Sequence, residues 1–563
     1  MNIIFLMNDT LRADHINAYQ RHTPWNRPGH EGQPFIETPH LDKLAEESAL
    51  FDRCYVGSYP TIPNRHDLAT GRFGFPTIGW EPLKADEVVI AERLESRGYV
   101  SMMIFDTPPL ANDDYNFTRG FTAWDWVRGQ HRDRWITDPV ELTLPTSYKT
   151  KSPTGLQLYL LNATRRQYER DWMCAKTALA ACDWLERNKT RERFFLWVDM
   201  WDPHDPFEAP TYDMARYTDP DYRGLPIIYP KYGRADYMTP EELNDVRARY
   251  AAKVQFVDRS VGRILDCVQA VGLDRNTLII HTTDHGHLFG EHGLQGKPTG
   301  PLGRLYEPTT RIPLLIRHPE GLGQGRRIGA IVQPPDVTAT ILAAAGISDA
   351  EIQGESLLPL MAGTSEGSRK YAFSGRFSRQ VNILSAGAAA PKRGAASFDG
   401  WVGIDATSEP ITVTTDEWSL IVSPDGGPPP ELYHLTNDPS QQHNVYNAYS
   451  KEAEELHQAL VDFLTECGAS RERIAAYTMG SHGTSSTTAQ ALPTSTLVYS
   501  IRIDGRPYAF LSEDEAIFNR VDDSPIESMT LDRLQSIDGH AMVCIGDQYY
   551  WATDVAFATR SQE

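Results

Sequence analysis

The sequence predicts an α/β fold in which a central, mostly parallel sheet lies between two layers of helices. Two observations predict it. Short apolar runs alternate with helical patterns from the first residues onward, and polar residues stand directly at the ends of these runs. Strands that are buried on both faces read as continuous apolar runs, and intervening helices connect parallel neighbours. Ligand sites in such sheets lie at the carboxyl ends of the strands.

The individual elements follow from local patterns. Apolar runs predict strands, and apolar positions three and four residues apart predict helices. The longest helical pattern, 243–271, places Tyr250, Val254, Val257 and Val261 on one face. In chain order we expect a strand at 3–7, helices at 39–47 and 85–97, a strand at 100–105, a helix at 174–187, a strand at 194–199, the long helix, and a strand at 277–281.

The pattern changes after about residue 365. Antiparallel strands are expected at 418–422 and 431–435 around a turn at 424–427, followed by a helix at 452–464. The Gly/Ala/Ser-rich segment 377–400 and the Ser/Thr/Gly-rich segment 481–496 are typical of loops. Short strands are expected beyond them, at 497–503, 541–545 and 549–552. We therefore expect a catalytic α/β domain at 1–365, a smaller α+β subdomain with an antiparallel sheet at 366–480, and an extension at 481–563 that either serves assembly into a homo-oligomer or caps the site of a neighbouring subunit.

The composition excludes several classes of partner. The chain has 563 residues and a formal charge of −21, so it lacks the basic footprint of a nucleic-acid binder, and its acidity disfavours anionic membranes. No apolar run reaches membrane-spanning length, and the N-terminus reads as a strand, not a signal peptide. Six scattered cysteines form no CxxC pair, which is typical of free thiols in a reducing cell. We expect a cytoplasmic protein that binds neither nucleic acid nor membranes.

The densest group of chemically active residues lies at 283–297. Asp284 and His285 follow a buried strand, where they are costly unless they are paired or bind a metal. Asp9 ends the first strand, so the three side chains form a mixed oxygen and nitrogen set suited to one divalent cation. The imidazole favours manganese, zinc or iron, while calcium stays possible. The alternative is a helix-capping aspartate beside a core histidine.

Thr61 is the candidate nucleophile. It stands in the segment Ser58-Tyr59-Pro60-Thr61-Ile62-Pro63-Asn64-Arg65, which reads as a proline-flanked turn. A hydroxyl that binds a cation loses its proton more easily and can attack an ester, and Arg65 can orient or neutralise it. Without the metal-ligand candidates this short string would read as an ordinary turn.

Two further residues are placed to contact a substrate. His204 lies between prolines in a loop that follows the strand at 194–199, where it can protonate a leaving group. Lys297 ends the glycine-rich loop of the metal-ligand candidates, where it can bind an anionic oxygen. The alternatives are a surface histidine and a solvated surface lysine.

These segments, in this order, resemble the sulfatase branch of the alkaline phosphatase superfamily. The matching segments are 9–15, the T-x-P-x-R and T-G-R of 61–72, the W-D-P-H of 201–204, and 283–297 with its sequel at 306–314. The resemblance covers roughly residues 1 to 465. It implies an alkaline-phosphatase-like sandwich with a smaller C-terminal sheet, and a metal-dependent ester hydrolase of small anionic substrates. By this resemblance the metal ligands are Asp9, Thr61, Asp284 and His285, Arg65 supports the nucleophile, and His204 and Lys297 contact the leaving side of the substrate.

Three departures from the sulfatase pattern bear on the substrate. Threonine stands where sulfatases carry the cysteine or serine that becomes formylglycine, and threonine cannot form that aldehyde. Many sulfatases have two consecutive aspartates where this chain has Asp9-Thr10. The family's G-K-W-H segment aligns with 105–109, which lacks its lysine and histidine. Phosphonate monoester hydrolases and phosphodiesterases of the superfamily show a similar loss.

The leading hypothesis is a single-metal hydrolase of phosphodiesters or phosphonate monoesters. Thr61 attacks, a phosphoryl-threonine forms, and water releases it. A sulfatase that uses unmodified threonine is the first alternative, and a non-catalytic metal-binding homologue is the second. The Trp- and Arg-rich segment 114–167 either covers the cleft and selects the alcohol or is a structural insertion.

Overall fold

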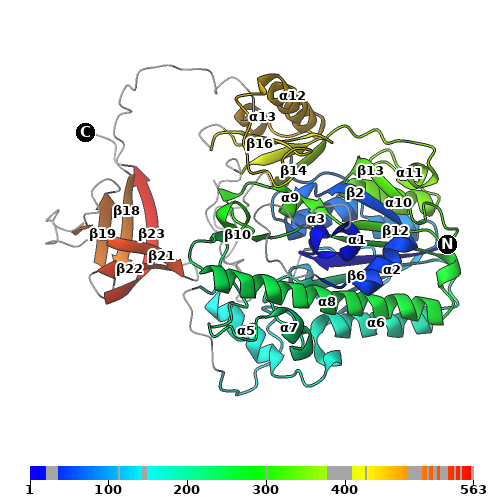
Figure 1. The fold of residues 1–563 in the computed structure, drawn as a ribbon, viewed down its shortest axis with the longest axis horizontal. Coiled ribbons are helices and arrows are strands. Elements are labelled where there is room, and N and C mark those ends of the chain that lie inside the picture. Colours follow the sequence, from blue (N-terminus) through cyan, green and yellow to red (C-terminus); the bar gives the residue numbers. More distant parts are fainter. Residues whose placement is uncertain are drawn as a thin grey trace. The chain divides into compact units, whose positions relative to one another are not determined.

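The computed structural model describes residues 1–20, 36–111, 115–142, 149–299, 302–376, 409–424 and 428–478, together with six strands between 497 and 559 (Figure 1). The chain divides into two compact units. The first contains nearly all residues up to Ser481, and the second contains His482–Glu563. Each unit is described by itself.

A nine-stranded mixed sheet forms the centre of the first unit. Its order is β11-β2-β12-β8-β1-β6-β4-β5, and β13 pairs with β2. The five strands from β8 to β5 run parallel, whereas β12 is antiparallel to both of its neighbours. The strands are β1 (Asn2–Asp9), β2 (Ala49–Tyr55), β4 (Val100–Phe105), β5 (Ala123–Trp126), β6 (Phe194–Pro203), β8 (Thr277–Thr283), β11 (Arg311–Ile312), β12 (Leu314–Arg317) and β13 (Arg327–Val332).

Helices cover both faces of this sheet, as Figure 1 shows. Successive side chains of a strand point to opposite faces, so β1 places Ile4 and Leu6 in one core and Ile3, Phe5 and Met7 in the other. One face packs against α2 (Pro39–Glu46), α6 (Met173–Asn188) and α8 (Pro240–Ala270), and the other against α3 (Thr61–Thr70), α4 (Ile90–Glu95), α10 (Pro334–Ala344) and α11 (Leu358–Ala362). Shorter elements of this unit are α1 (Asn17–Gln20), α5 (Pro153–Ala163), α7 (Thr211–Tyr217), α9 (Glu307–Thr310), β7 (Gly233–Arg234), β9 (Leu288–Phe289) and β10 (Leu294–Gly296).

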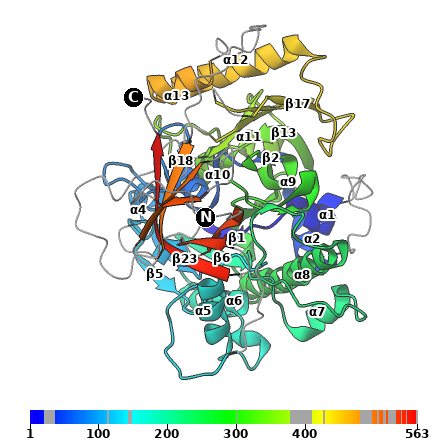
Figure 2. The same ribbon diagram turned by 90° about the vertical axis from the view of Figure 1, so that its left-hand side faces the viewer.

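A smaller five-stranded sheet adjoins the candidate nucleophile in the same unit. Its order is β17-β16-β15-β14-β3. Only β3 (Ser58–Tyr59) comes from the N-terminal part of the chain, and it pairs parallel with β14 directly before Thr61. Figure 2 shows α12 and α13 along the outer side of this sheet. The remaining elements are β14 (Ala372–Arg376), β15 (Ile411–Thr414), β16 (Trp418–Val422), β17 (Glu431–His434), α12 (Ser450–Glu466) and α13 (Arg471–Ala476).

The second unit contains one antiparallel sheet in the part that the structure describes. Its order is β20-β19-β18-β23-β22-β21. The strands are β18 (Leu497–Ile503), β19 (Arg506–Leu511), β20 (Ile517–Asn519), β21 (Leu531–Ile537), β22 (His540–Ile545) and β23 (Gln548–Thr559).

The predicted fold class is confirmed: a large, mostly parallel sheet between helices, with a smaller antiparallel sheet. Two local expectations are wrong. The helix expected at 85–97 spans only Ile90–Glu95, because Glu87 closes a turn onto Lys84 and binds His66 instead of entering a helix. Thr61 is not in a turn but is the first residue of α3.

Some expectations fall outside the described residues. These are the loops at 377–400 and 481–496 and the centre of the turn at 424–427. Among the helices that the structure describes, none combines the length and apolar character needed to cross a membrane.

Candidate active site

Three neighbouring parallel strands bring the predicted site residues to one edge of the central sheet. β1 lies between β6 and β8 and runs parallel to both. Asp9 is the last residue of β1, and Asp284 and His285 follow β8. Asp199 lies inside β6, which continues to Pro203, and His204 directly follows that strand. The polar strand ends therefore converge as the sequence predicts.

The four predicted metal ligands lie together and are buried. Asp9, Asp284 and His285 are fully buried and each offers a ligand atom within 4.8 Å of the others. The Oγ1 atom of Thr61 lies 3.3 Å from Nε2 of His285. The Nδ1 atom of His285 lies 2.9 Å from the carbonyl oxygen of Gly286, which only accepts hydrogen bonds, so Nδ1 carries the proton. Its Nε2 lone pair therefore faces Thr61 and the carboxylates.

Arg65 links this group to a further carboxylate. Its Nη1 donates to Asp9 at 3.1 Å and to Asp284 at 2.7 Å, while Nε and Nη2 donate to the two oxygens of Asp199 at 2.9 and 2.8 Å. The hydroxyl of Thr107 also donates to Asp199. Sequence reasoning placed Asp199 at a polar strand end but gave it no role. The signal that could have found it is a carboxylate inside a strand that is buried along its whole length.

The charges of the centre fit a divalent cation. Three buried carboxylates (Asp9, Asp199, Asp284) and the Arg65 guanidinium give a net charge of −2 when all are ionised. Burial and the neighbouring Asp284 raise the pKa of Asp9, because the protein's own cations do not fully compensate the carboxylates. Burial lowers the pKa of His285 well below its usual value, so its ring is neutral and able to bind a metal. The mixed donor set suits a transition metal.

The nucleophile candidate begins helix α3, which is fixed to its surroundings by one carboxylate. Asp67 accepts hydrogen bonds from the amide and hydroxyl of Ser58 and from the amide of Gly74, and so ties α3 to β3. The helix ends at Thr70 and is capped by Gly71, whose φ of +72° favours glycine. The start of a helix carries a partial positive charge, so an anion bound near Thr61 is stabilised there.

Two polar side chains beside the nucleophile have no hydrogen-bond partner among the described residues. They are the hydroxyl of Tyr59 and the amide of Asn64, and both residues are fully buried. The ring of Tyr59 lies 5.0 Å from the ring of His285 and 4.5 Å from the guanidinium carbon of Arg376. Buried polar atoms of this kind are costly unless a ligand, a metal or water satisfies them. The site therefore offers donors that a bound substrate can use.

His204 and Lys297 are buried, which excludes the two surface alternatives. Burial lowers the pKa of His204, although Asp205 opposes this. Burial also lowers the pKa of Lys297, and the carboxylates of Asp9 and Asp205 oppose it. The Nζ atom of Lys297 lies 5.7 Å from the centre of the Tyr232 ring. Since both side chains interact electrostatically with Asp9, they belong to the same charged centre.

Part of the segment 114–167 reaches this centre. Its residue His131 is buried and lies edge-on to His204, with 5.7 Å between ring centres. Gln130 donates to Asp202 at 3.0 Å and holds the segment against the loop that carries His204. His131, which has a positive φ of 49°, was not singled out from the sequence, because nothing in its local pattern marks it.

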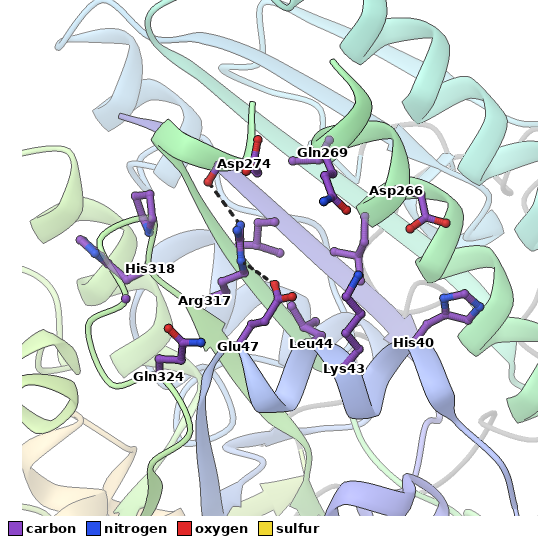
Figure 3. Close-up of a pocket in the computed structure, with 15 residues that line it drawn as sticks. His40, Lys43, Leu44, Glu47, Asp266, Gln269, Asp274, Arg317, His318 and Gln324 are labelled. Atoms are coloured by element: carbon purple, nitrogen blue, oxygen red, sulfur yellow. Dashed lines mark hydrogen bonds and ion pairs between the residues drawn. The ribbon is translucent and has the colours of Figure 1, made fainter. Parts of the chain in front are cut away.

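A cavity of about 330 Å³ lies away from the chemistry (Figure 3). It is lined by residues of α2 and α8 and by Asp274, just before the start of β8, where Arg317 pairs with Glu47 at 3.0 Å. This is the end of β8 opposite to Asp284. The carboxyl-edge cluster, and not this cavity, is therefore the candidate active site.

With this geometry in place, the comparison with known proteins identifies the class. Residues 1–347 match the Sulfatase family model, so the chain belongs to the sulfatase family. It is accordingly a hydrolase of ester bonds. N-acetylglucosamine-6-O-sulfatase of Bacteroides thetaiotaomicron is 25% identical over 432 residues, which cover 64% of this chain and 70% of that protein. Arylsulfatase K of Xenopus laevis is 24% identical over 458 residues, covering 76% of this chain and 77% of that protein.

Solved structures show the same fold. The phosphonate monoester hydrolase of Agrobacterium radiobacter aligns with a TM-score of 0.62 at 22% identity, covering 83% of this chain and 96% of that one. The phosphonate monoester hydrolase of Silicibacter pomeroyi aligns with a TM-score of 0.60 at 22% identity and the same coverage of both chains. At these identities the likeness concerns the fold.

Proposed function

We propose that this protein is a single-metal hydrolase of phosphodiesters or phosphonate monoesters that uses Thr61 as its nucleophile. One observation carries the proposal. An unmodified threonine hydroxyl stands at the start of α3, 3.3 Å from the Nε2 lone pair of His285, within the group formed with Asp9 and Asp284. This is the position that a nucleophile activated by a cation requires.

The chemistry of threonine favours phosphorus over sulfur. A formylglycine hydrate can expel sulfate by returning to the aldehyde, whereas a sulfated threonine has no such exit. A phosphoryl-threonine, in contrast, is released by in-line attack of water on phosphorus. The segment 105–109 supplies no cation to the site: Thr107 binds Asp199, and Asp106 accepts a hydrogen bond from the amide of Trp201 at 2.6 Å. Fewer cations suit a singly charged ester better than a dianion.

The reaction would proceed in two displacements. Thr61 Oγ1 gives its proton to solvent and attacks phosphorus as the bond to the leaving oxygen breaks, and the protonated ring of His204 gives that oxygen a proton; Thr61 takes a proton back from solvent when its own bond to phosphorus breaks in the second step. Water then attacks phosphorus, His204 takes a proton from this water, and the bond to Thr61 breaks. The sum is one ester and one water converted to an alcohol and an acid, with both residues restored.

The remaining residues hold the charges in place. A cation bound by Asp9, Thr61, Asp284 and His285 would offset the carboxylates and lower the proton affinity of the hydroxyl. Arg65 keeps the two carboxylates oriented through Nη1 while Asp199 holds its other nitrogens. Lys297 supplies positive charge on the leaving side. Manganese, zinc or iron fit the donor set better than calcium.

A sulfatase that uses unmodified threonine is the second candidate. The names of two relatives of this chain, an N-acetylglucosamine-6-O-sulfatase and an arylsulfatase K, favour this second candidate. A non-catalytic metal-binding homologue is disfavoured, because the whole charged centre is assembled, from Asp9 to Lys297. Assembly into a homo-oligomer, a cytoplasmic location and the absence of nucleic-acid or membrane partners stay predictions.

A direct assay separates these functions. The protein, loaded in turn with manganese, zinc and calcium, is offered an aryl phosphodiester, a phosphonate monoester, a phosphate monoester and a sulfate monoester. We expect the diester and the phosphonate to react fastest, and Thr61→Ala to lower their turnover by at least about 1,000-fold. Thr340→Ala, a change of an equally buried threonine in α10, is the matched control.

Each other outcome has a distinct meaning. Faster turnover of the sulfate ester selects the sulfatase alternative. Full activity of Thr61→Ala rejects the nucleophile, and a metal-loaded protein without any esterase activity supports the non-catalytic alternative. Acid quenching during turnover, followed by mass spectrometry, should find a phosphoryl group on the peptide that contains Thr61.

A further inference from the structure

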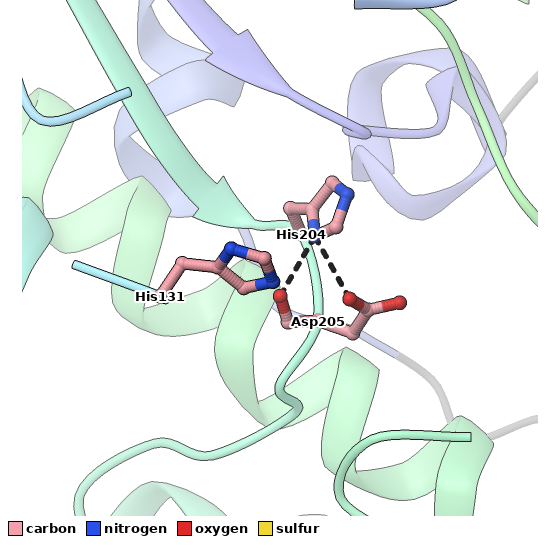
Figure 4. A group of neighbouring side chains, drawn as sticks. All are labelled: His131, His204 and Asp205. Carbon is pink, nitrogen blue, oxygen red and sulfur yellow. Dashed lines mark hydrogen bonds and ion pairs between the residues drawn. The ribbon is translucent and has the colours of Figure 1, made fainter. Parts of the chain in front are cut away.

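We propose that Asp205 is a positioning residue for His204: it fixes the ring so that Nε2 exchanges the proton of the leaving group. This inference deepens the proposed function and rests on it. It concerns a residue that neither the sequence patterns nor the comparisons single out. Figure 4 shows the two side chains with their neighbour His131.

The hydrogen bonds of His204 determine which nitrogen carries the proton. Its Nδ1 donates a hydrogen bond to the main-chain oxygen of Asp205 at 2.7 Å and lies 3.0 Å from the carboxylate Oδ1 of the same residue, which is an ion-pair contact and not a second hydrogen bond (Figure 4). Both oxygens only accept hydrogen bonds, so Nδ1 is protonated whether the ring is charged or neutral. The lone pair of the neutral ring is therefore on Nε2, which is the nitrogen left to meet a substrate.

Asp205 is itself held rigidly and stays ionised. It is fully buried, and the hydroxyl of Tyr232 donates to its second oxygen, Oδ2, at 2.6 Å. Although burial opposes it, the charges of His204 and Lys151 hold the pKa of Asp205 well below its usual value. Lys253 fixes the backbone of the same loop by donating to the carbonyl oxygens of His204 at 2.6 Å and of Pro206 at 2.9 Å. The ring thus has one orientation.

Among the charged groups around His204, Asp205 is the one that most favours the protonated ring. Lys297 disfavours a charged ring, whereas Asp205 and, more weakly, Asp9 favour it. The Nε2 atom of His131 lies 2.8 Å from the hydroxyl of Tyr229, so this nitrogen is paired with Tyr229 and not with Asp205. His204 gives the Nε2 proton to the leaving group, is neutral in the intermediate, and regains a proton from the attacking water; Asp205 stabilises the charged ring that starts and ends this cycle.

The same side chains could instead hold a cation. Ligand atoms of His131, His204 and Asp205 lie within 4.8 Å of one another and all three residues are buried. The His204 nitrogen that lies against Asp205 is Nδ1, and it cannot bind a metal while it donates a hydrogen bond to the main-chain oxygen of Asp205. The hydrogen-bonded pair is therefore the arrangement that the geometry favours, and a metal is an outcome of the test.

The kinetic test is Asp205→Asn assayed on esters whose leaving groups differ in acidity. Protonation by a positioned acid raises the reaction rate of esters with poor leaving groups by about 100-fold or more and that of esters with good leaving groups only slightly. We expect turnover of a phenyl or alkyl ester to fall about 100-fold, and that of the 4-nitrophenyl ester less than about 10-fold. Tyr232→Phe, which removes one hydrogen bond to Asp205, should also lower turnover of the esters with poor leaving groups more than that of the 4-nitrophenyl ester, but by a smaller factor than Asp205→Asn.

The control is Asp213→Asn, which removes an equally buried carboxylate that pairs with Arg259 between α7 and α8. Asp213→Asn should leave the dependence on the leaving group unchanged. If Asp205→Asn lowers all esters by the same factor, its effect is structural and the proposal is overturned. Full activity of Thr61→Ala, with the expected leaving-group dependence still found in Asp205→Asn, would reject the proposed nucleophile and leave the positioning role of Asp205 standing.

A second measurement does not need turnover. In protein with ¹⁵N-labelled histidine rings, the signals that His204→Gln removes belong to His204. The proposal predicts that they show a protonated Nδ1 in the wild type, and that Asp205→Asn shifts them. A protonated Nε2 in the neutral ring, or a second equivalent of bound metal that His131→Asn abolishes, would overturn it.

Discussion

Removing the carboxylate of Asp199 should destabilise the protein and weaken its metal site together. Asp199 is fully buried and holds two nitrogens of Arg65 at 2.9 and 2.8 Å, while Thr107 and Trp197 also donate to it. In Asp199→Ala the buried guanidinium keeps only Asp9 and Asp284 as anionic partners. Those are the two carboxylates that a cation needs.

The magnitude follows from this arrangement. Breaking a buried ion pair by removing one partner typically costs about 3–5 kcal/mol, because the remaining charge stays buried. Part of this cost is avoided in the metal-free protein, since Arg65 also contacts Asp9 and Asp284. We therefore expect Asp199→Ala to lower the free energy of unfolding by about 3 kcal/mol without metal and by about 5 kcal/mol with metal bound. Because stability with and without metal is linked to affinity, a difference of about 2 kcal/mol corresponds to about 30-fold weaker metal binding.

Urea unfolding with and without manganese measures both effects, and titration with the metal measures the affinity directly. Asp183→Ala, at a pair exposed on α6 with 3.9 Å between its charged atoms, is the control and should change the free energy of unfolding by less than about 0.5 kcal/mol. If Asp199→Ala unfolds at the wild-type urea concentration and binds metal equally well, then Arg65 does not depend on Asp199 and the charge argument is refuted.

Three further predictions concern stability. The hydrogen bond to Glu87 and the nearby carboxylate of Asp67 outweigh burial and raise the pKa of His66 from 6.5 to about 9. Its contribution to stability of about 3 kcal/mol is therefore complete below pH 6.5 and is lost as the pH rises through about 9. His66→Gln should flatten the dependence of the urea midpoint on pH over this range, and an unchanged slope would contradict this assignment. Tyr59→Phe removes a buried hydroxyl that has no hydrogen-bond partner among the described residues. This change should raise the free energy of unfolding by about 1 kcal/mol and lower kcat/KM. A loss of stability would show that the hydroxyl has a partner in the free protein. A Cβ at Gly286 would lie 1.9 Å from the main-chain oxygen of Pro308. Gly286→Ala should therefore displace the neighbouring ligand candidate His285, lower the free energy of unfolding by about 1–3 kcal/mol and weaken metal binding. Wild-type metal affinity would show that this loop can move to accommodate the methyl group.

The sequence predicted the sheet because its strands are marked twice, by apolar runs and by the polar residues that follow them. The runs at 100–105 and 418–422 correspond to β4 and β16 without change. The helix expected at 85–97 was too long, because amphipathic spacing cannot show that Glu87 binds His66 across the fold. The joining of β3 to the later sheet was also not predictable, since a two-residue strand carries no periodicity.

In the active site, the residues that the sequence marked are those held by local motifs. Asp9, Asp284 and His285 stand at strand ends, and the structure brings them together. Asp199 and His131 were missed as site residues for a common reason. Each acts through a partner far along the chain, 134 residues away for Asp199 and Arg65, and such pairing leaves no pattern within a short window.

The departures from the sulfatase pattern fit one another physically. Where many sulfatases have a second aspartate, the hydroxyl of Thr10 donates to Asp9 at 2.7 Å and its amide donates to Asp284 at 2.9 Å. A negative charge is thus replaced by hydrogen bonds that keep the two remaining carboxylates in position. With one anion fewer, a divalent cation and Arg65 are enough to offset the three carboxylates of Asp9, Asp199 and Asp284. The loss of cations at 105–109 therefore favours a singly charged ester over a phosphate monoester dianion, and the threonine at 61 favours a phosphorus ester over a sulfate that must be released through an aldehyde.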